Sequence, residues 1–424
     1  MNQPTNSKST QVYQITIIGI LFFIFGFVTW LNGTLIQFLK LACDLKTDTQ
    51  AFLVTFAFFM AYFFLSIPSS FILNVTGYKR GMALGLAVMG IGSLIFIPAA
   101  SERSFNIFLL GLFMQGVGLA LLQTASNPYI SIIGSLESAA SRISIMGICN
   151  KVGGALSPLI LGFIVFSDAD TVKKDLLAAS NSETRNSILN NLAARIVTPY
   201  TLLAVVLFAL ALMLYFSNLP EIKEASSSDD TTDSANQKKP WQIPYVLLGA
   251  LCIFMYVGAE VMTGDIIGTY GKNLGFGLST TKYFTTFTLV AMLVGYVIGL
   301  ATIPKYISQE KSLLYAAVGA IVLSFIAYFS SGYMSVTCIA LLGVFNAPMW
   351  PAIIPLGIRY LGKWTKLGSA FLIMGIAGGG VIPQIYGRLV DAHIWDFKFG
   401  FLITLLVCYS YVLWYALRGY KISS

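Results

Sequence analysis

Three ionisable side chains stand out because they fall inside long apolar stretches of this sequence. Glu260, Asp265 and Lys151 lie in runs otherwise rich in Leu, Ile, Val, Phe and Gly. Placing such a group at the middle of a bilayer costs about 2.5–3.5 kcal/mol, so each needs a polar partner or water. A buried carboxylate can take up a proton or, together with hydroxyl and carbonyl oxygen atoms, a small cation. These residues are therefore the first candidates for chemistry.

Glu260 is the leading candidate for a cation site. Thr263 follows it by one helical turn on the same face, so H+ or Na+ could bind beside both. Neutralising a buried carboxylate would shift a conformational balance. The alternative is that Glu260 only pairs with a basic residue, for which Lys151 is the obvious choice. Asp265, five residues further toward the outer end of the helix, ranks second, as a solvated or gating carboxylate.

Amide side chains form a stripe on the fourth apolar run. Gln115, Gln123 and Asn127 recur at multiples of four residues and share one helix face. Amides both donate and accept hydrogen bonds, as sugar hydroxyls require, and aromatic rings stack on the apolar face of a sugar. For each amide, hydrogen bonding between helices is the alternative. Further candidates for substrate contact are Trp30, Asn32, Asn150, Asn346, Trp350 and Gln384.

Twelve apolar runs position these residues, each long enough to cross about 30 Å of hydrocarbon. We expect helices near 13–39, 50–74, 82–99, 105–132, 141–166, 197–217, 243–272, 280–303, 312–330, 332–358, 366–389 and 396–417. The polar linker 218–241 divides them into six-helix bundles over 1–217 and 242–424. The polar stretch 167–195 predicts an external loop with a short amphipathic helix.

Composition excludes an ordinary soluble protein. Of 424 residues, 56% are hydrophobic and 10% charged, with a mean hydropathy of +0.77, whereas charged residues make up about a quarter of soluble domains. The net charge of +8 comes from Lys and Arg scattered at the ends of apolar runs, which indicates membrane topology rather than nucleic-acid binding. Their distribution favours cytoplasmic N- and C-termini. The single His393 and the unpaired Cys residues argue against a metal centre.

The two halves also resemble each other. FVTWLNGTLIQ at 27–37 aligns with GAEVMTGDIIG at 258–268, which matches Gly33 with Gly264. Polar positions in the first helix of each half are typical of a two-bundle transporter with its site at the midplane. Chance similarity between apolar segments is the alternative.

Several segments resemble the fucose, galactose and glucose symporter family of the major facilitator superfamily. They are LFFIFGFVTWLNGTLI at 21–36, LLQTASNPYI at 121–130, GVFNAPMWPAI at 343–353 and GGGVIP at 378–383. The resemblance implies an all-α integral membrane fold of twelve helices in two pseudo-symmetric bundles. It also implies alternating access and hexose uptake coupled to H+ or Na+ across a bacterial inner membrane.

The chain departs from this family at informative positions. GAEV at 258–261 resembles the acidic segment of glucose-type members, but Gly33 and Gln123 stand where fucose-type members have carboxylates, which shifts coupling to Glu260. Lys151 stands where many relatives have a small polar residue. This difference leads to the hypothesis of a modified substrate, such as an N-acetylated hexose.

Charged residues at the predicted cytoplasmic side suggest gating. Lys79 and Arg80, in TGYKRG, resemble the basic loop of the superfamily, and Glu137 with Arg142 predicts a gating pair. A surface salt bridge of about 0–1 kcal/mol is the alternative for that pair. We expect a monomeric sugar symporter that needs no cofactor and is not an enzyme. A proton-coupled exporter or antiporter of the same fold and a non-transporting sugar sensor are the alternatives.

Overall fold

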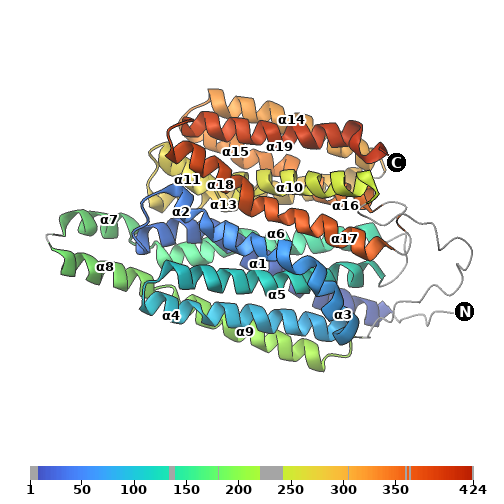
Figure 1. Ribbon diagram of the computed structural model, residues 1–424, viewed down its shortest axis with the longest axis horizontal. Coiled ribbons are helices and arrows are strands. Elements are labelled where there is room, and N and C mark those ends of the chain that lie inside the picture. Colours follow the sequence, from blue (N-terminus) through green and yellow to red (C-terminus); the bar gives the residue numbers. More distant parts are fainter. Residues whose placement is uncertain are drawn as a thin grey trace, which may run out of the picture.

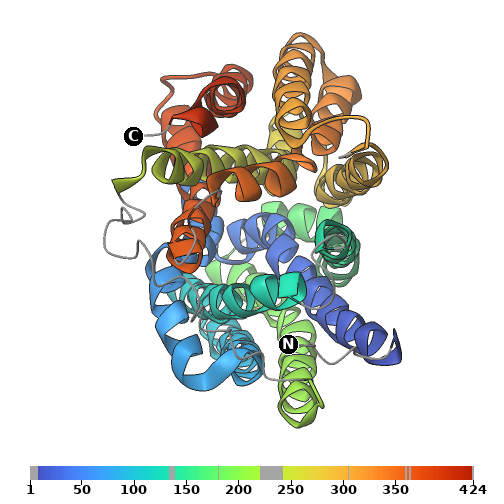
Figure 2. The same cartoon turned by 90° about the vertical axis from the view of Figure 1, so that its right-hand side faces the viewer.

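The computed structural model describes residues 8–132, 139–179, 181–219, 242–303, 305–358, 361 and 364–422. All regular elements in these ranges are helices, which confirms the predicted fold class. Figure 2 shows the helices of the first half, α1 to α9, on one side of the molecule and those of the second half, α10 to α19, on the other.

The helices of the first half follow the predicted runs closely. Their bounds are α1 Lys8–Ala42, α2 Asp48–Ala51, α3 Leu53–Leu94, α4 Phe96–Ser101, α5 Phe105–Ile132, α6 Ala139–Val165, α7 Ala169–Ala178, α8 Ser182–Ala194 and α9 Val197–Phe216. The second half comprises α10 Pro244–Gly264, α11 Ile267–Asn273, α12 Leu278–Thr281, α13 Phe284–Thr302, α14 Gln309–Phe329, α15 Gly332–Asn346, α16 Met349–Gly357, α17 Thr365–Met374, η4 Gly375–Ala377, α18 Gly378–Asp391, α19 Phe397–Leu417 and η5 Gly419–Lys421.

The described residues contain eleven stretches long and apolar enough to span a membrane. One of these stretches is long enough to cross the membrane twice. Leu53–Ser101 has 49 residues, and a straight helix of that size would be roughly 70 Å long, about twice the thickness of the hydrocarbon core. Gly77 interrupts it with φ 76° and ψ 172°, a conformation that only glycine adopts without strain. The chain thus crosses twelve times. The loop predicted between 74 and 82 is instead a kink at this one glycine.

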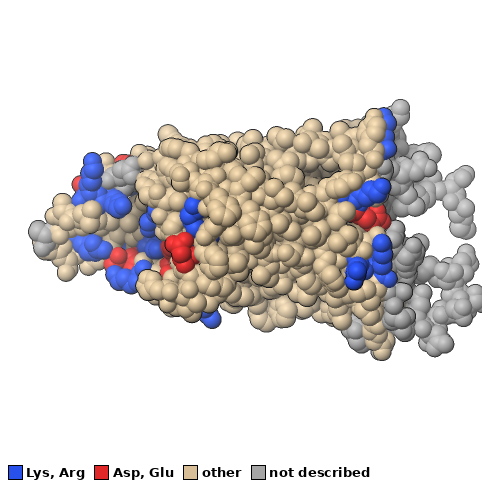
Figure 3. Space-filling view, turned by 90° about the horizontal axis from the view of Figure 1, so that it is seen from above, with Lys and Arg blue, Asp and Glu red and all other residues tan. Residues whose placement is uncertain are grey.

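The surface has the charge distribution of a membrane protein. Lys, Arg, Asp and Glu gather at the two ends of the face in Figure 3 and leave a broad uncharged belt between them. The start of α1 and the end of α19 lie at one end, and α7 and α8 project from the other (Figure 1). We call the end with α7 and α8 the outer end.

The 167–195 stretch contains two helices, α7 and α8, rather than the single short helix predicted. The side chain of Asn181 caps α8 by accepting a hydrogen bond from the Thr184 amide at 2.7 Å. Leu189 and Leu192 of α8 are buried. The predicted loop is therefore a helical hairpin in which α8 packs against α1 and α4, whereas Leu177 of α7 stays exposed.

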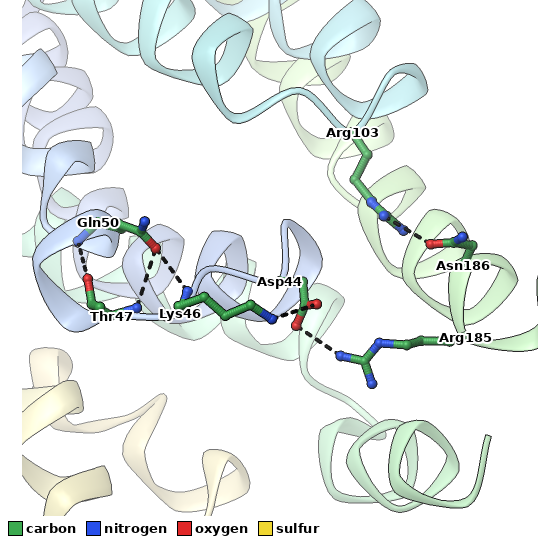
Figure 4. Close-up of polar contacts among 7 residues, drawn as sticks. All are labelled: Asp44, Lys46, Thr47, Gln50, Arg103, Arg185 and Asn186. Carbon is green, nitrogen blue, oxygen red and sulfur yellow. Dashed lines mark hydrogen bonds and ion pairs between the residues drawn. The ribbon is translucent and has the colours of Figure 1, made fainter. Parts of the chain in front are cut away.

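Charged side chains hold this hairpin to the outer ends of the first half (Figure 4). Asp44 accepts hydrogen bonds from Arg185 Nη2 at 2.9 Å and from Lys46 Nζ at 3.3 Å. Arg103 Nη2 donates to Asn186 Oδ1 at 3.1 Å. Partial burial raises the pKa of Asp44, but the hydrogen bond from Lys46 and the charge of Arg185 outweigh it, so this pKa is lowered from its ordinary value.

Candidate substrate and cation site

An ion pair joins the two halves of the molecule. Lys151 Nζ on α6 lies 2.9 Å from Glu260 Oε1 on α10, and the two residues are only 6% and 8% exposed. The Lys151 ammonium also lies 4.6 Å from the ring centroid of Trp30 on α1. Three of the predicted site residues therefore meet at the boundary between the halves. Removing one member of such a buried pair leaves an uncompensated charge, which typically costs about 3–5 kcal/mol.

Trp30 is held in place by two glycines, one from each half. A Cβ atom on Gly154 of α6 would come 2.4 Å from the indole, and one on Gly264 of α10 would come 2.3 Å from it. Only residues without a side chain allow both helices to approach this closely. The indole consequently forms a fixed wall beside the Lys151–Glu260 pair.

A hydrogen-bond network lies behind Glu260 in the second half. Asn346 Nδ2 donates to Thr263 Oγ1 at 3.0 Å, and the Tyr409 hydroxyl donates to Asn346 Oδ1 at 2.9 Å. Thr263 Oγ1 in turn donates to the Glu260 carbonyl at 3.0 Å. These bonds tie α10 to α15 and α19. Asn346 is fully buried, and both ends of its amide are engaged by protein groups.

Sequence reasoning did not find Tyr409 or Tyr296. Both are buried and lie close enough to Glu260 to be affected by its charge. Both tyrosines lie in apolar runs, and a buried tyrosine hydroxyl usually has a polar partner. This pattern could have indicated that they lie near a polar site.

The predicted amides separate into buried and partly exposed members. Gln115 is 1% exposed and donates to Ser93 Oγ at 2.8 Å, within the first half. Gln123, Asn127 and Asn150 are partly exposed. The other amide bonds run from Gln123 to the Tyr62 hydroxyl, from Asn150 to the Phe22 carbonyl and from Gln384 to the Thr49 carbonyl. Hydrogen bonds between helices thus engage at least one polar atom of Gln115, Gln123, Asn150 and Gln384.

Two further substrate candidates differ in exposure. Asn32 is fully buried, and neither polar atom of its side chain has a hydrogen-bond partner among the described residues. Trp350 is partly exposed, with its ring centroid 6.5 Å from that of Tyr256. A cleft of about 310 Å³ opens elsewhere, between α3 and α18, and Gln384 is the one predicted site residue that lines it.

Asp265 is not solvated, contrary to one of the two roles predicted for it. It is 1% exposed, and no side chain of the described residues donates a hydrogen bond to its carboxyl group. From the first half it faces Gly33, where a Cβ atom would lie 3.1 Å from Asp265 Oδ1. The sequence could not reveal this burial, because it depends on which residue the opposite half presents.

The predicted gating residues are only partly described. Lys79 Nζ donates to the Ser217 carbonyl at 2.6 Å, and Arg80 is exposed. Arg142 is buried, and its Nε donates to the Ile130 carbonyl at 3.0 Å. Glu137 lies outside the described residues, so its pairing with Arg142 stays a prediction.

Comparison with known proteins agrees with this architecture. The profile of the Major Facilitator Superfamily matches residues 18–383. The chain is 33% identical to a glucose/galactose transporter of Brucella abortus biovar 1 (strain 9-941), over 99% of this chain and 97% of the relative. It is 26% identical to the L-fucose-proton symporter of Escherichia coli (strain K12), over 92% and 90% of the two chains.

The crystal structure of the E. coli fucose:proton symporter is similar to this chain, with a TM-score of 0.73 and 26% sequence identity. The match covers 96% of this chain and 99% of that chain. The twelve crossings, the uncharged belt and the polar residues between two helical halves define a multi-pass membrane protein of the transporter type. The chain belongs to the Major Facilitator Superfamily.

Proposed function

We propose that this protein is a cation-coupled symporter that imports a hexose-type sugar by alternating access. The Lys151–Glu260 pair is the observation on which this proposal depends, because its two members belong to different halves. The names of the relatives, a glucose/galactose transporter and an L-fucose-proton symporter, support a sugar as the substrate. We place the protein in a bacterial inner membrane with both termini in the cytoplasm, and we expect it to act as a monomer.

Rocking of the two halves would couple the cation to transport. When α6 and α10 separate, Glu260 loses Lys151 and needs another positive partner, which H+ or Na+ from the outside can supply. When the halves return to the arrangement seen here, the Lys151 ammonium takes the place of that cation, which leaves toward the cytoplasm. Lys151 and the coupling cation thus compete for one carboxylate, and the loss or gain of the pair biases the conformational equilibrium.

The sugar site would use predicted side chains that keep some exposure. Trp350, Gln123, Asn127 and Asn150 are the partly exposed candidates, and amide and aromatic groups together suit the polar edge and apolar face of a sugar. Gln115 and Asn346 serve better as ties between helices, since protein groups occupy their amides.

Counterflow in proteoliposomes tests the substrate and the ion together. A panel of hexoses, amino sugars and N-acetylated sugars would be compared with and without Na+ and with imposed pH gradients. We expect counterflow of at least one sugar and accumulation driven by one of the two cations. Sugar binding without flux would instead indicate a sensor, and proton-driven efflux of apolar compounds would indicate an exporter.

A further inference from the structure

The two halves meet tightly at the outer end along α1. Gln37 Oε1 of α1 accepts a hydrogen bond from Thr281 Oγ1 of α12 at 2.7 Å. One helical turn earlier, Gly33 packs against Asp265 and Thr285, with its Cβ position only 3.2 Å from the Asp265 Cα atom. We call this contact of Gly33 and Gln37 with Asp265, Thr281 and Thr285 the outer gate.

The closed outer gate buries the Asp265 carboxyl group, and the nearby Gly33 backbone amide offsets less of the cost of a charge there than burial imposes. The residue is 1% exposed and accepts no side-chain hydrogen bond within the described part of the chain. The one nearby hydroxyl, Thr285 Oγ1, donates instead to the Gly264 carbonyl at 2.8 Å. A carboxylate buried in this way is unfavourable when charged and far less so when neutral.

The charged groups around Asp265 do not remove this cost. The two that act on it are Glu260, on the same helix, and Lys151, on α6, and these two already neutralise each other as an ion pair. The facing positions on α1 and α13 are Gly33 and Thr285, neither of which titrates.

A proton suits this place better than a metal cation. Hard metal cations need several oxygen ligands at once, and the Thr285 hydroxyl is already engaged. The pocket is also tight, because even a methyl group on Gly33 would lie 2.6 Å from Thr285 Oγ1 and 3.1 Å from Asp265 Oδ1. A proton needs no such space.

We propose that Asp265 is a proton-binding site of the outer gate, so that α1 closes onto α10 when this carboxyl group is protonated. Opening the gate hydrates the group and lets it ionise. Through Asp265, lower pH therefore favours the closed outer gate, and higher pH favours the open one. This inference rests on the proposed rocking of the halves but assigns its own role to a residue distinct from the Lys151–Glu260 pair.

Distances between spin labels at the outer end test the proposal without sugar and without transport. Glu102 and Asn273 are exposed outer-end positions, one on each half, and would be labelled in full-length protein whose five cysteines are replaced by Ala. We expect the short-distance population in lipid nanodiscs to grow as the pH falls from about 8.5 to 5.5. For one proton, the closed-to-open ratio changes by at most about tenfold per pH unit.

Two variants and one control make the test specific. Asp265→Asn imitates the neutral carboxyl group and should give the short distance at every pH. Gly33→Ala should give the long distance at every pH, because its Cβ atom collides with Thr285. Asp391→Asn is the control, since Asp391 also bridges the halves at this end but accepts a hydrogen bond from the Thr49 amide at 2.9 Å and is partly exposed. It should keep the wild-type pH response.

Equal pH responses in the wild type and in Asp265→Asn would overturn the proposal, whether both responses are large or both are absent. Since no sugar is present, either result leaves the proposed symport function standing. Conversely, a failure of sugar counterflow would not affect this measurement.

Discussion

Two carboxyl groups on one stretch of the second half, five residues apart, have opposite surroundings. Glu260 faces Lys151, and Asp265 faces Gly33. Both are buried and both meet the first half, which presents an ammonium group to Glu260 and no side chain to Asp265. Separation of the halves would remove the partner of Glu260 and would give water to Asp265. One motion therefore has opposite electrostatic effects at two neighbouring sites, which makes it sensitive to cation binding at both.

The largest expected effect comes from breaking the pair on one side only. Lys151→Met leaves Glu260 buried and unpaired, and we expect a loss of about 3–5 kcal/mol in the free energy of unfolding. The double variant Lys151→Met with Glu260→Gln removes both charges and should recover most of that loss. Thermal unfolding in detergent measures the stability of the single and double variants relative to wild type. Equal destabilisation by the single and double variants would show that the charges are not coupled.

A smaller effect is expected in the network behind Glu260. Tyr409→Phe removes the hydrogen bond to Asn346 and should cost about 0.5–1.5 kcal/mol. Tyr415→Phe is the matched control, because the buried Tyr415 hydroxyl has no partner among the described residues and its removal should be neutral or slightly stabilising. The same unfolding assay compares the two. The network would lose its assigned role if both variants had the same stability.

The smallest effect concerns Asp44, a partly exposed carboxylate, in contrast to the two buried ones. Its pKa is lowered in the folded protein, so its contacts stabilise the hairpin above the unfolded value of about 3.9 and are lost as the pH falls through the folded pKa. Because both side chains of the pair with Arg185 stay about 40% exposed, Arg185→Gln should change stability by less than about 1 kcal/mol.

Limited proteolysis of the α7–α8 hairpin measures this last effect. Cleavage should be equally slow at pH 7 and pH 5 in the wild type, because both lie above about 3.9. Arg185→Gln should speed cleavage slightly at both pH values. A marked rise in wild-type cleavage between pH 7 and pH 5 would mean that another group holds the hairpin.

Sequence patterns predicted the architecture well because lipid imposes strong constraints. The twelve crossings follow from apolar length, and the intramembrane Lys151 and Glu260 each required a partner that few residues could provide. The burial of Asp265 was missed because it depends on the contact between α1 and α10, which no local pattern encodes. The second helix of the 167–195 hairpin was missed because its apolar residues are sparse. The kink at Gly77 was taken for a loop because the charged residues next to it resemble one.

Transport by the double variant Lys151→Met with Glu260→Gln, which leaves no unpaired buried charge, tests the central claim most directly in proteoliposomes. Exchange of sugar across the membrane needs only reorientation of the loaded protein, so we expect exchange to persist in this variant. Accumulation against a gradient needs the cation, so an imposed H+ or Na+ gradient should no longer concentrate sugar in the vesicles. Normal gradient-driven accumulation by this variant would contradict the account.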